Sequence, residues 1–188
     1  MRKALLALLA LVLPLACGHA GAATFADKNL GQLVAEAEQI FVGSVRSLQS
    51  SRLASGAIVT DATFSDLQMV KGSNAGADIV LRMLGGEVGG VRLEIPGLPQ
   101  FRRDARYLVF VKGNGKDMFP VVGGPAGMYL VAGATEGAAR IVLTWSGMPL
   151  ADAIAAEVRA SLAGAAQATS AVTLEQFVAA VTNRLSGQ

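Results

Sequence analysis

Two β-rich runs followed by a cluster of glycines, within residues 58–90, constrain the fold of this chain more than any other stretch. The first run extends from residue 58 to about residue 70, and the second covers residues 78–84. A glycine-containing turn separates them, and Gly-Gly-Glu-Val-Gly-Gly follows at residues 85–90. β-Branched residues bounded by turns are typical of antiparallel strands, and glycines at their ends allow sharp bends. The stretch predicts a small, strongly curved antiparallel sheet.

Further short runs extend this β region. Gly43 lies inside the predicted strand at residues 40–48, where a bulge or bend is expected. The run at residues 107–111 is apolar throughout and predicts a strand buried on both faces. Asn114-Gly115 predicts a tight turn, and residues 85–99 predict either an edge strand or a long ordered loop. The predicted strands cover residues 40–48, 58–70, 78–84, 107–111, 118–122, 128–132 and 140–144.

Helical patterns flank the β region. Residues 24–39 predict a short amphipathic helix, with Asp27 or Asn29 as its cap. A second helix is expected from residue 150, and Thr173 caps a third, with Glu175 and Gln176 in its first turn. The apolar faces comprise Leu30, Leu33, Val34 and Ala37 in the first helix, Leu150, Ile154, Val158 and Leu162 in the second, and Phe177, Val178, Val181 and Leu185 in the third.

The N-terminus has the three parts of a secretory signal peptide. Met1-Arg2-Lys3 is basic, residues 4–16 are apolar apart from Pro14, and Ala20-Gly21-Ala22 has the small residues that signal peptidase accepts. The apolar run is too short to span a membrane. We expect cleavage after Ala22 or one residue later, and export to the periplasm or the medium.

Cleavage would remove the only cysteine, Cys17, and the only histidine, His19. A mature chain without these residues has no His-based triad, no Cys nucleophile, no disulfide and no His or Cys zinc site, so neither a metal nor a cofactor is expected. Losing Arg2 and Lys3 from 16 basic residues would leave 14, equal to the 14 acidic residues. That balance argues against binding to nucleic acid or an anionic membrane.

Two alternatives to a soluble binding protein remain open. Cys17 could carry a lipid anchor, although the residues before it fit a lipoprotein signal poorly. A hydrolase acting on a glycan through carboxylates alone is the other alternative. Its candidate residues are Asp61, Asp66, Glu87, Glu94 and Asp104.

The candidate protein-binding residues fall in two segments. Basic residues gather in a polar turn at residues 101–106, where Asp104 is expected to pair with them locally. The second segment, residues 123–129, is expected to be a flexible glycine-rich loop that enters a strand. The candidate residues are Arg102, Arg103, Arg106, Gly123, Gly124, Met128 and Tyr129.

Residues 40–144 resemble bacterial secreted domains similar to the netrin-like module of tissue inhibitors of metalloproteinases. The resemblance lies in Val70-Lys71-Gly72 and in Arg106-Tyr107-Leu108-Val109-Phe110, in a matching order of strands. It implies an OB-type barrel that presents loops to another protein, with an exported metalloprotease as a candidate partner. Those inhibitors chelate zinc through an N-terminal cysteine, whereas this mature chain would begin Ala23-Thr24-Phe25. The same inhibitory mechanism is therefore excluded.

Together these observations predict a mainly β fold. It would be an OB-like β-barrel of five or more antiparallel strands, with a short N-terminal helix and two C-terminal helices. The expected organisation is a signal peptide at 1–22, a barrel domain at 23–149 and a helical segment at 150–188. The predicted function is a secreted, non-enzymatic module that contacts another protein.

Overall fold

The computed structural model describes residues 28–133, 139–162 and 171–187, so the predicted signal peptide lies outside the described residues. The described residues are mainly β, with three α-helices and one 3₁₀ turn. The strands are β1 (Gln39–Arg52), β2 (Ile58–Lys71), β3 (Ile79–Leu84), β4 (Gly86–Val88), β5 (Val91–Leu93), β6 (Arg106–Val111), β7 (Met128–Ala132) and β8 (Ile141–Thr144). The helices are α1 (Leu30–Glu36), α2 (Asp152–Ala160) and α3 (Leu174–Ser186), and the 3₁₀ turn is η1 (Gly124–Gly127).

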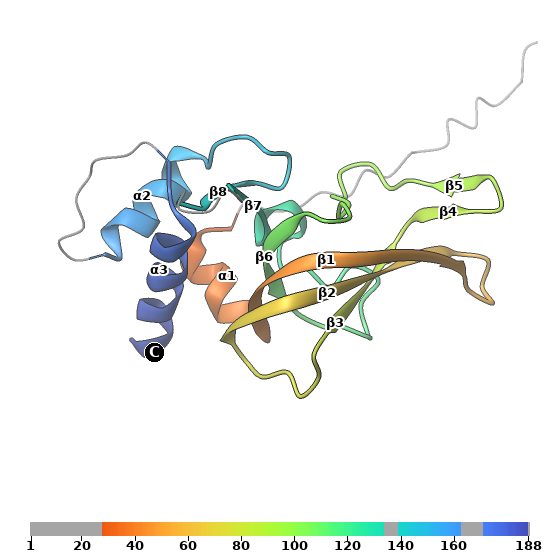
Figure 1. The fold of residues 1–188 in the computed structure, drawn as a ribbon, viewed down its shortest axis with the longest axis horizontal. Helices are drawn as coiled ribbons and strands as arrows, with labels where there is room; N and C mark the ends of the chain where they lie inside the picture. Colours follow the sequence, from red (N-terminus) through yellow and green to blue (C-terminus); the bar gives the residue numbers. More distant parts are fainter. Residues whose placement is uncertain (1–27, 134–138, 163–170, 188) are drawn as a thin grey trace, which may run out of the picture.

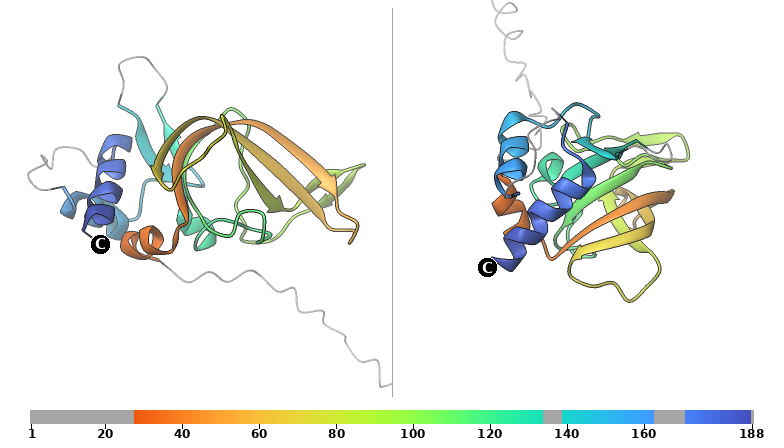
Figure 2. Two further views of the ribbon diagram at one scale, coloured as in Figure 1. Left: turned by 90° about the horizontal axis from the view of Figure 1, so that it is seen from below. Right: turned by 60° about the vertical axis from the view of Figure 1, so that its left-hand side comes forward.

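Six strands form one antiparallel sheet in the order β3-β2-β1-β6-β7-β8, and β4 and β5 form a separate hairpin. The long strands β1 and β2 pair along their length, β6 pairs with the first half of β1, and β3 pairs with the first half of β2. Figures 1 and 2 show both long strands bending, with the helices gathered at one end and the β4–β5 hairpin at the other. The predicted curved sheet is therefore present.

Gly43 occupies a bulge, as predicted. The β1–β2 register shifts between Val42 and Ser44. A Cβ atom at Gly43 would lie 2.8 Å from the Leu67 side chain and 3.3 Å from the carbonyl oxygen of Ser65. A side chain at this position would therefore displace the end of Leu67 and press on the backbone of β2 at the bend.

The sheet separates two hydrophobic cores. The inner core includes an edge-to-face series of aromatic rings from Phe41 through Phe64 and Phe101 to Tyr107. The outer core lies between the sheet and the three helices, where Phe177 contacts Phe110 and Tyr129. Because the C-terminal helices supply much of this outer core, they pack on the sheet of their own chain.

The expected barrel closure is not seen among the described strands. The edge strands β3 and β8 do not pair with each other, so the sheet is open. The edge of β8 is instead covered by bridges from Ile141 to Thr173 and from Leu143 to Pro149. The segments around Pro149 and Thr173 therefore pair with the edge of β8 that a closing strand would otherwise occupy.

Several predicted elements need correction. Residues 118–122 are not a strand: Val121 forms only an isolated bridge with Val111. β1 continues to Arg52, because its polar second half still pairs with β2. Residues 85–99 contain the β4–β5 hairpin rather than a single edge strand or loop. The second helix begins at Asp152, so Leu150 precedes it.

Both predicted caps that fall on described residues are confirmed. The Asn29 side chain accepts a hydrogen bond from the backbone N–H of Gln32, and Thr173 does the same with Gln176. Each partner side chain bonds back to the cap residue, which completes a capping box. The first helix is shorter than predicted because it starts after Asn29.

Candidate functional site

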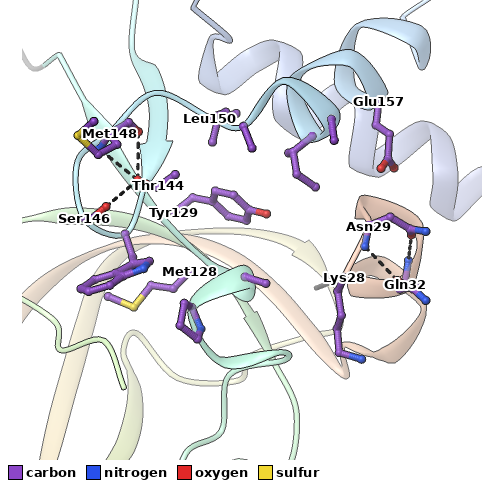
Figure 3. Close-up of a pocket in the computed structure, with 16 residues that line it drawn as sticks. Lys28, Asn29, Gln32, Met128, Tyr129, Thr144, Ser146, Met148, Leu150 and Glu157 are labelled. Carbon is purple, nitrogen blue, oxygen red and sulfur yellow. Dashed lines mark hydrogen bonds between the residues drawn. The ribbon is translucent and has the colours of Figure 1, made fainter. Parts of the chain in front are cut away.

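A groove of about 720 Å³ opens between α1, η1, β7, the β8–α2 connection and α2 (Figure 3). This volume lies within the roughly 300–1,000 Å³ typical of ligand sites. Its lining includes the apolar side chains of Met128, Leu150 and Ile154. The described lining residues are Lys28, Asn29, Gln32, Pro125, Ala126, Met128, Tyr129, Thr144, Trp145, Ser146, Met148, Leu150, Ala151, Ala153, Ile154 and Glu157.

A tight turn after β8 holds two large apolar side chains at the rim of the groove. Trp145 is 38% exposed and Met148 is 63% exposed. The backbone N–H of Thr144 donates to the carbonyl of Met148 at 2.8 Å, and the backbone N–H of Met148 donates to the Thr144 hydroxyl at 3.1 Å. Gly147 has a φ of 86°, a conformation that favours glycine. These contacts fix the turn, so the two apolar side chains are presented in a defined arrangement.

Tyr129 lies at the centre of the groove. Its ring contacts Phe110 and Phe177, with centroids 6.0 and 4.9 Å away, and the residue is only 5% exposed. In Figure 3 its hydroxyl points toward the side of the groove where Asn29 and Glu157 lie. Burial raises the pKa of Tyr129 above its ordinary value, and the nearby Glu157 carboxylate raises it further. The side chain therefore remains a neutral phenol at physiological pH.

Glu157 joins the three helices beside the groove. Its Oε2 atom accepts hydrogen bonds from the backbone N–H of Leu30 and from Arg184, both at 3.1 Å. A carboxylate at the start of α1 also interacts favourably with the helix dipole. Lys28, which lies near Asn29 in the groove lining (Figure 3), donates to Glu36 at 2.6 Å. The charges around this end of the groove are therefore paired.

The structure brings only part of the predicted site together. Met128 and Tyr129 line the groove at the start of β7. Gly124 begins η1 and Gly123 precedes it, so this segment is a short 3₁₀ turn rather than a flexible glycine loop. A Cβ atom at Gly123 would lie 2.9 Å from the Lys28 side chain, which places the glycine against the groove rim.

The predicted arginine cluster does not line the groove. Arg102 and Arg103 are exposed in the turn before β6, and Asp104 forms no ion pair with a described arginine. Arg106 belongs to β6, where it donates to the Ser44 hydroxyl and to the backbone carbonyl of Asp66. Burial lowers the pKa of Arg106, and Arg140 nearby adds to that effect. Arg106 thus supports the bulged strands.

The five predicted carboxylates do not gather in the groove either, where Glu157 is the one acidic residue among the described lining. Asp61 forms a two-point ion pair with Arg82, and Glu94 lies 3.4 Å from Arg92. Among the described residues no three His, Cys, Asp or Glu side chains are placed to hold a metal ion.

Sequence reasoning missed Trp145, Met148 and Glu157. A usable signal was present for the first two, because the only tryptophan of the chain stands in Thr-Trp-Ser-Gly-Met directly after a predicted strand. Large apolar residues in a turn have few ways to be buried. Glu157 gave no such signal, because its hydrogen bonds form only when α1 and α3 pack beside it in the folded chain.

Comparison with known proteins found no matching family model, no matching curated protein and no matching solved structure. Within the described ranges, no helix has the length and apolar character needed to cross a membrane. The site must therefore be interpreted from its own geometry and chemistry.

Proposed function

We propose that this chain is a non-enzymatic module that binds another protein through the groove. The observation that carries the proposal is the fixed turn that holds Trp145 and Met148 exposed at the groove rim. Tryptophan, tyrosine and methionine are enriched at protein interfaces, and aromatic anchors supply much of the binding energy. A turn already held by hydrogen bonds loses little further conformational entropy on binding.

The groove offers weaker support for catalysis. Glycosidases need two carboxyl groups on either side of the bond that is cleaved. The described lining contributes a single carboxyl group, that of Glu157. Its Oε2 atom already accepts two hydrogen bonds. We therefore favour binding over the carboxylate-based hydrolase. The lipid-anchored alternative depends on Cys17, which lies outside the described residues.

We further propose a relationship to OB-type modules of exported proteins. In its favour, one curved sheet encloses the inner core, and the segment after β6 hydrogen-bonds to the outer edge of β3. Leu84 donates its backbone N–H to the carbonyl of Met118, and the Asn114 side chain donates to the carbonyl of Val80. Export, and a secreted protease as partner, remain proposals based on the N-terminal pattern and on the family resemblance.

The first experiment compares capture of exported host proteins by the mature chain and by Trp145→Ala. Trp145→Ala should weaken binding of the captured partner by about 2 kcal/mol or more, the loss typical of an aromatic hot-spot residue. Val91→Ala is the matched control, because Val91 is 52% exposed on the distant β4–β5 hairpin.

Support requires that the purified partner rebinds with a saturable change in the fluorescence of Trp145, the only tryptophan in the chain. Equal binding by the wild type and Trp145→Ala would refute the groove as the binding site. Loss of binding in Val91→Ala alone would indicate that the interface lies on the β4–β5 hairpin instead.

A further inference from the structure

The Asn114-Gly115 pair, in the loop after β6, combines a reactive sequence with a structural role. Asn114 is the only asparagine in the chain that a glycine follows. The pair stands at the centre of a turn in which the backbone N–H of Lys116 donates to the carbonyl of Gly113 at 2.9 Å. Both Asn114 and Gly115 are exposed. Water therefore reaches the asparagine side chain and the peptide bond that follows it.

Little in the fold restrains the backbone on the glycine side of this pair. Gly115 has a φ of 82°, and a Cβ atom there would meet nothing within 4 Å beyond its chain neighbours. None of the described residues accepts a hydrogen bond from the backbone N–H of Gly115. Glycine also has a wide range of backbone conformations. The nitrogen of Gly115 can therefore approach the Asn114 side chain without displacing packed residues.

The side chain of Asn114 holds this loop against the sheet. Its Nδ2 atom donates to the backbone carbonyl of Val80 at 2.9 Å, and Val80 belongs to the edge strand β3. A second bond joins the same loop to β3, from the backbone N–H of Leu84 to the carbonyl of Met118 at 2.7 Å. The Asn114 bond is exposed, so water competes with it and frees the side-chain amide.

We propose that Asn114 is a site of spontaneous deamidation, and that the reaction releases the loop after β6 from the edge of β3. The backbone nitrogen of Gly115 attacks Cγ of Asn114 and forms a cyclic imide. The Cγ–Nδ2 bond breaks, and ammonia leaves with the proton from the attacking nitrogen. Water then opens one of the two carbonyl–nitrogen bonds of the ring, which leaves aspartate or isoaspartate. The reaction consumes only water and needs no oxidant.

Either product removes the donor that attaches the loop to Val80. A carboxylate has only acceptors, and the Val80 carbonyl is an acceptor too, so the two groups repel each other. Isoaspartate also lengthens the backbone of the turn. The bond between Leu84 and Met118 then loses the support of its neighbour. The outer edge of β3 becomes more accessible, and an accessible edge is where a sheet pairs with another chain.

Peptide mapping by mass spectrometry, after incubation of the purified chain at mildly alkaline pH, tests the reaction. The peptide containing Asn114 should gain the mass of an amide-to-acid exchange much faster than the peptide containing Asn183. Asn183 is the matched control, because it is exposed and its Nδ2 atom donates to the carbonyl of Ser161 at 2.8 Å, but arginine follows it within α3. Gly115→Ala should slow the conversion of Asn114 severalfold, because a methyl group crowds the attacking nitrogen.

Asn114→Asp tests the effect on the sheet, because this variant carries the aspartate product from the start. Hydrogen exchange at the Leu84 amide should be about fivefold faster than in the wild type, the loss expected for one exposed hydrogen bond in the same loop. Amides of β7, which pairs with β6 and β8 away from this loop, should change less. That difference separates release of the loop from a general loss of stability.

Faster conversion of Asn114 than of Asn183, together with faster Leu84 exchange in Asn114→Asp, supports the proposal. Three results would overturn it: equal conversion of the two asparagines, equal conversion of Asn114 in the wild type and Gly115→Ala, or wild-type exchange at Leu84 in Asn114→Asp. These outcomes are independent of the proposed binding function, because neither Asn114 nor Gly115 lines the groove.

Discussion

At the scale of single residues, the polar side chains of this protein divide into those that support the strands and those that remain available to a ligand. Asp61 and Arg82 belong to the first group. They face each other across β2 and β3 and form two hydrogen bonds of 2.7 Å. Tyr129 belongs to the second, because its hydroxyl faces the groove without a described partner. The sequence alone did not distinguish these roles.

The Asp61–Arg82 pair predicts a specific pH dependence of stability. Hydrogen bonds from Arg82 hold the pKa of Asp61 below its ordinary value of 3.8. The unfolded chain therefore takes up this proton more readily than the folded chain. The contribution of the pair is fully present above pH 3.8 and is lost as the pH falls through the lower, folded-state pKa.

Asp61→Asn should therefore lower the free energy of unfolding by up to about 1 kcal/mol at pH 7, since the Arg82 side chain is half exposed. The difference from the wild type should shrink as the pH falls below 3.8. Urea unfolding at several pH values measures both effects. Glu94→Gln, at an exposed position just after β5, is the control; a constant difference between Asp61→Asn and the wild type at all pH values would contradict the argument.

At the scale of elements, short helices are defined by their ends as much as by their apolar faces. Both Asn29 and Thr173 form capping boxes, and both were among the predicted caps. An isolated helix of 13 residues, such as α3, is only marginally stable in water, so the cap and the outer core must hold it together. Strand ends are less well specified, as the extension of β1 to Arg52 shows.

Thr173→Ala should lower the free energy of unfolding by about 1 kcal/mol, because it leaves the backbone N–H of Gln176 without its side-chain acceptor. Thr182→Ala is the matched control within α3. Its hydroxyl is exposed and donates to the carbonyl of Val178, a bond that adds little to helix stability. Denaturant unfolding should show a clear loss for Thr173→Ala alone, and equal losses for both variants would argue against the cap.

At the scale of the whole molecule, one sheet is shared by two cores. Residues of β1, β6 and β7 contribute to both the inner and the outer core. The C-terminal helices therefore stabilise the same strands that enclose the inner core. We expect the described strands and helices to unfold as one cooperative unit, although the sequence suggested a separate helical segment from residue 150.

Phe177→Ala, in the outer core, should lower the free energy of unfolding by about 3–5 kcal/mol, the usual cost of truncating a buried phenylalanine. Phe64→Ala should have a similar cost in the inner core. In both variants, Trp145 fluorescence and far-ultraviolet circular dichroism should report the same transition. If Phe177→Ala separates the two signals, the helices unfold independently of the sheet.

The mainly β class, the curved sheet, the bulge at Gly43 and the two helix caps could be predicted from the sequence. Each depends on residues close together in the chain, through strand periodicity, glycine or capping chemistry. By contrast, the open sheet and the role of Arg106 in supporting it depend on contacts between distant parts of the chain. Only the tertiary structure, likewise, brought Lys28, Tyr129, Trp145 and Glu157 around one groove. These residues are distant in sequence, and no local pattern records which side chains the packing of the helices on the sheet will leave exposed.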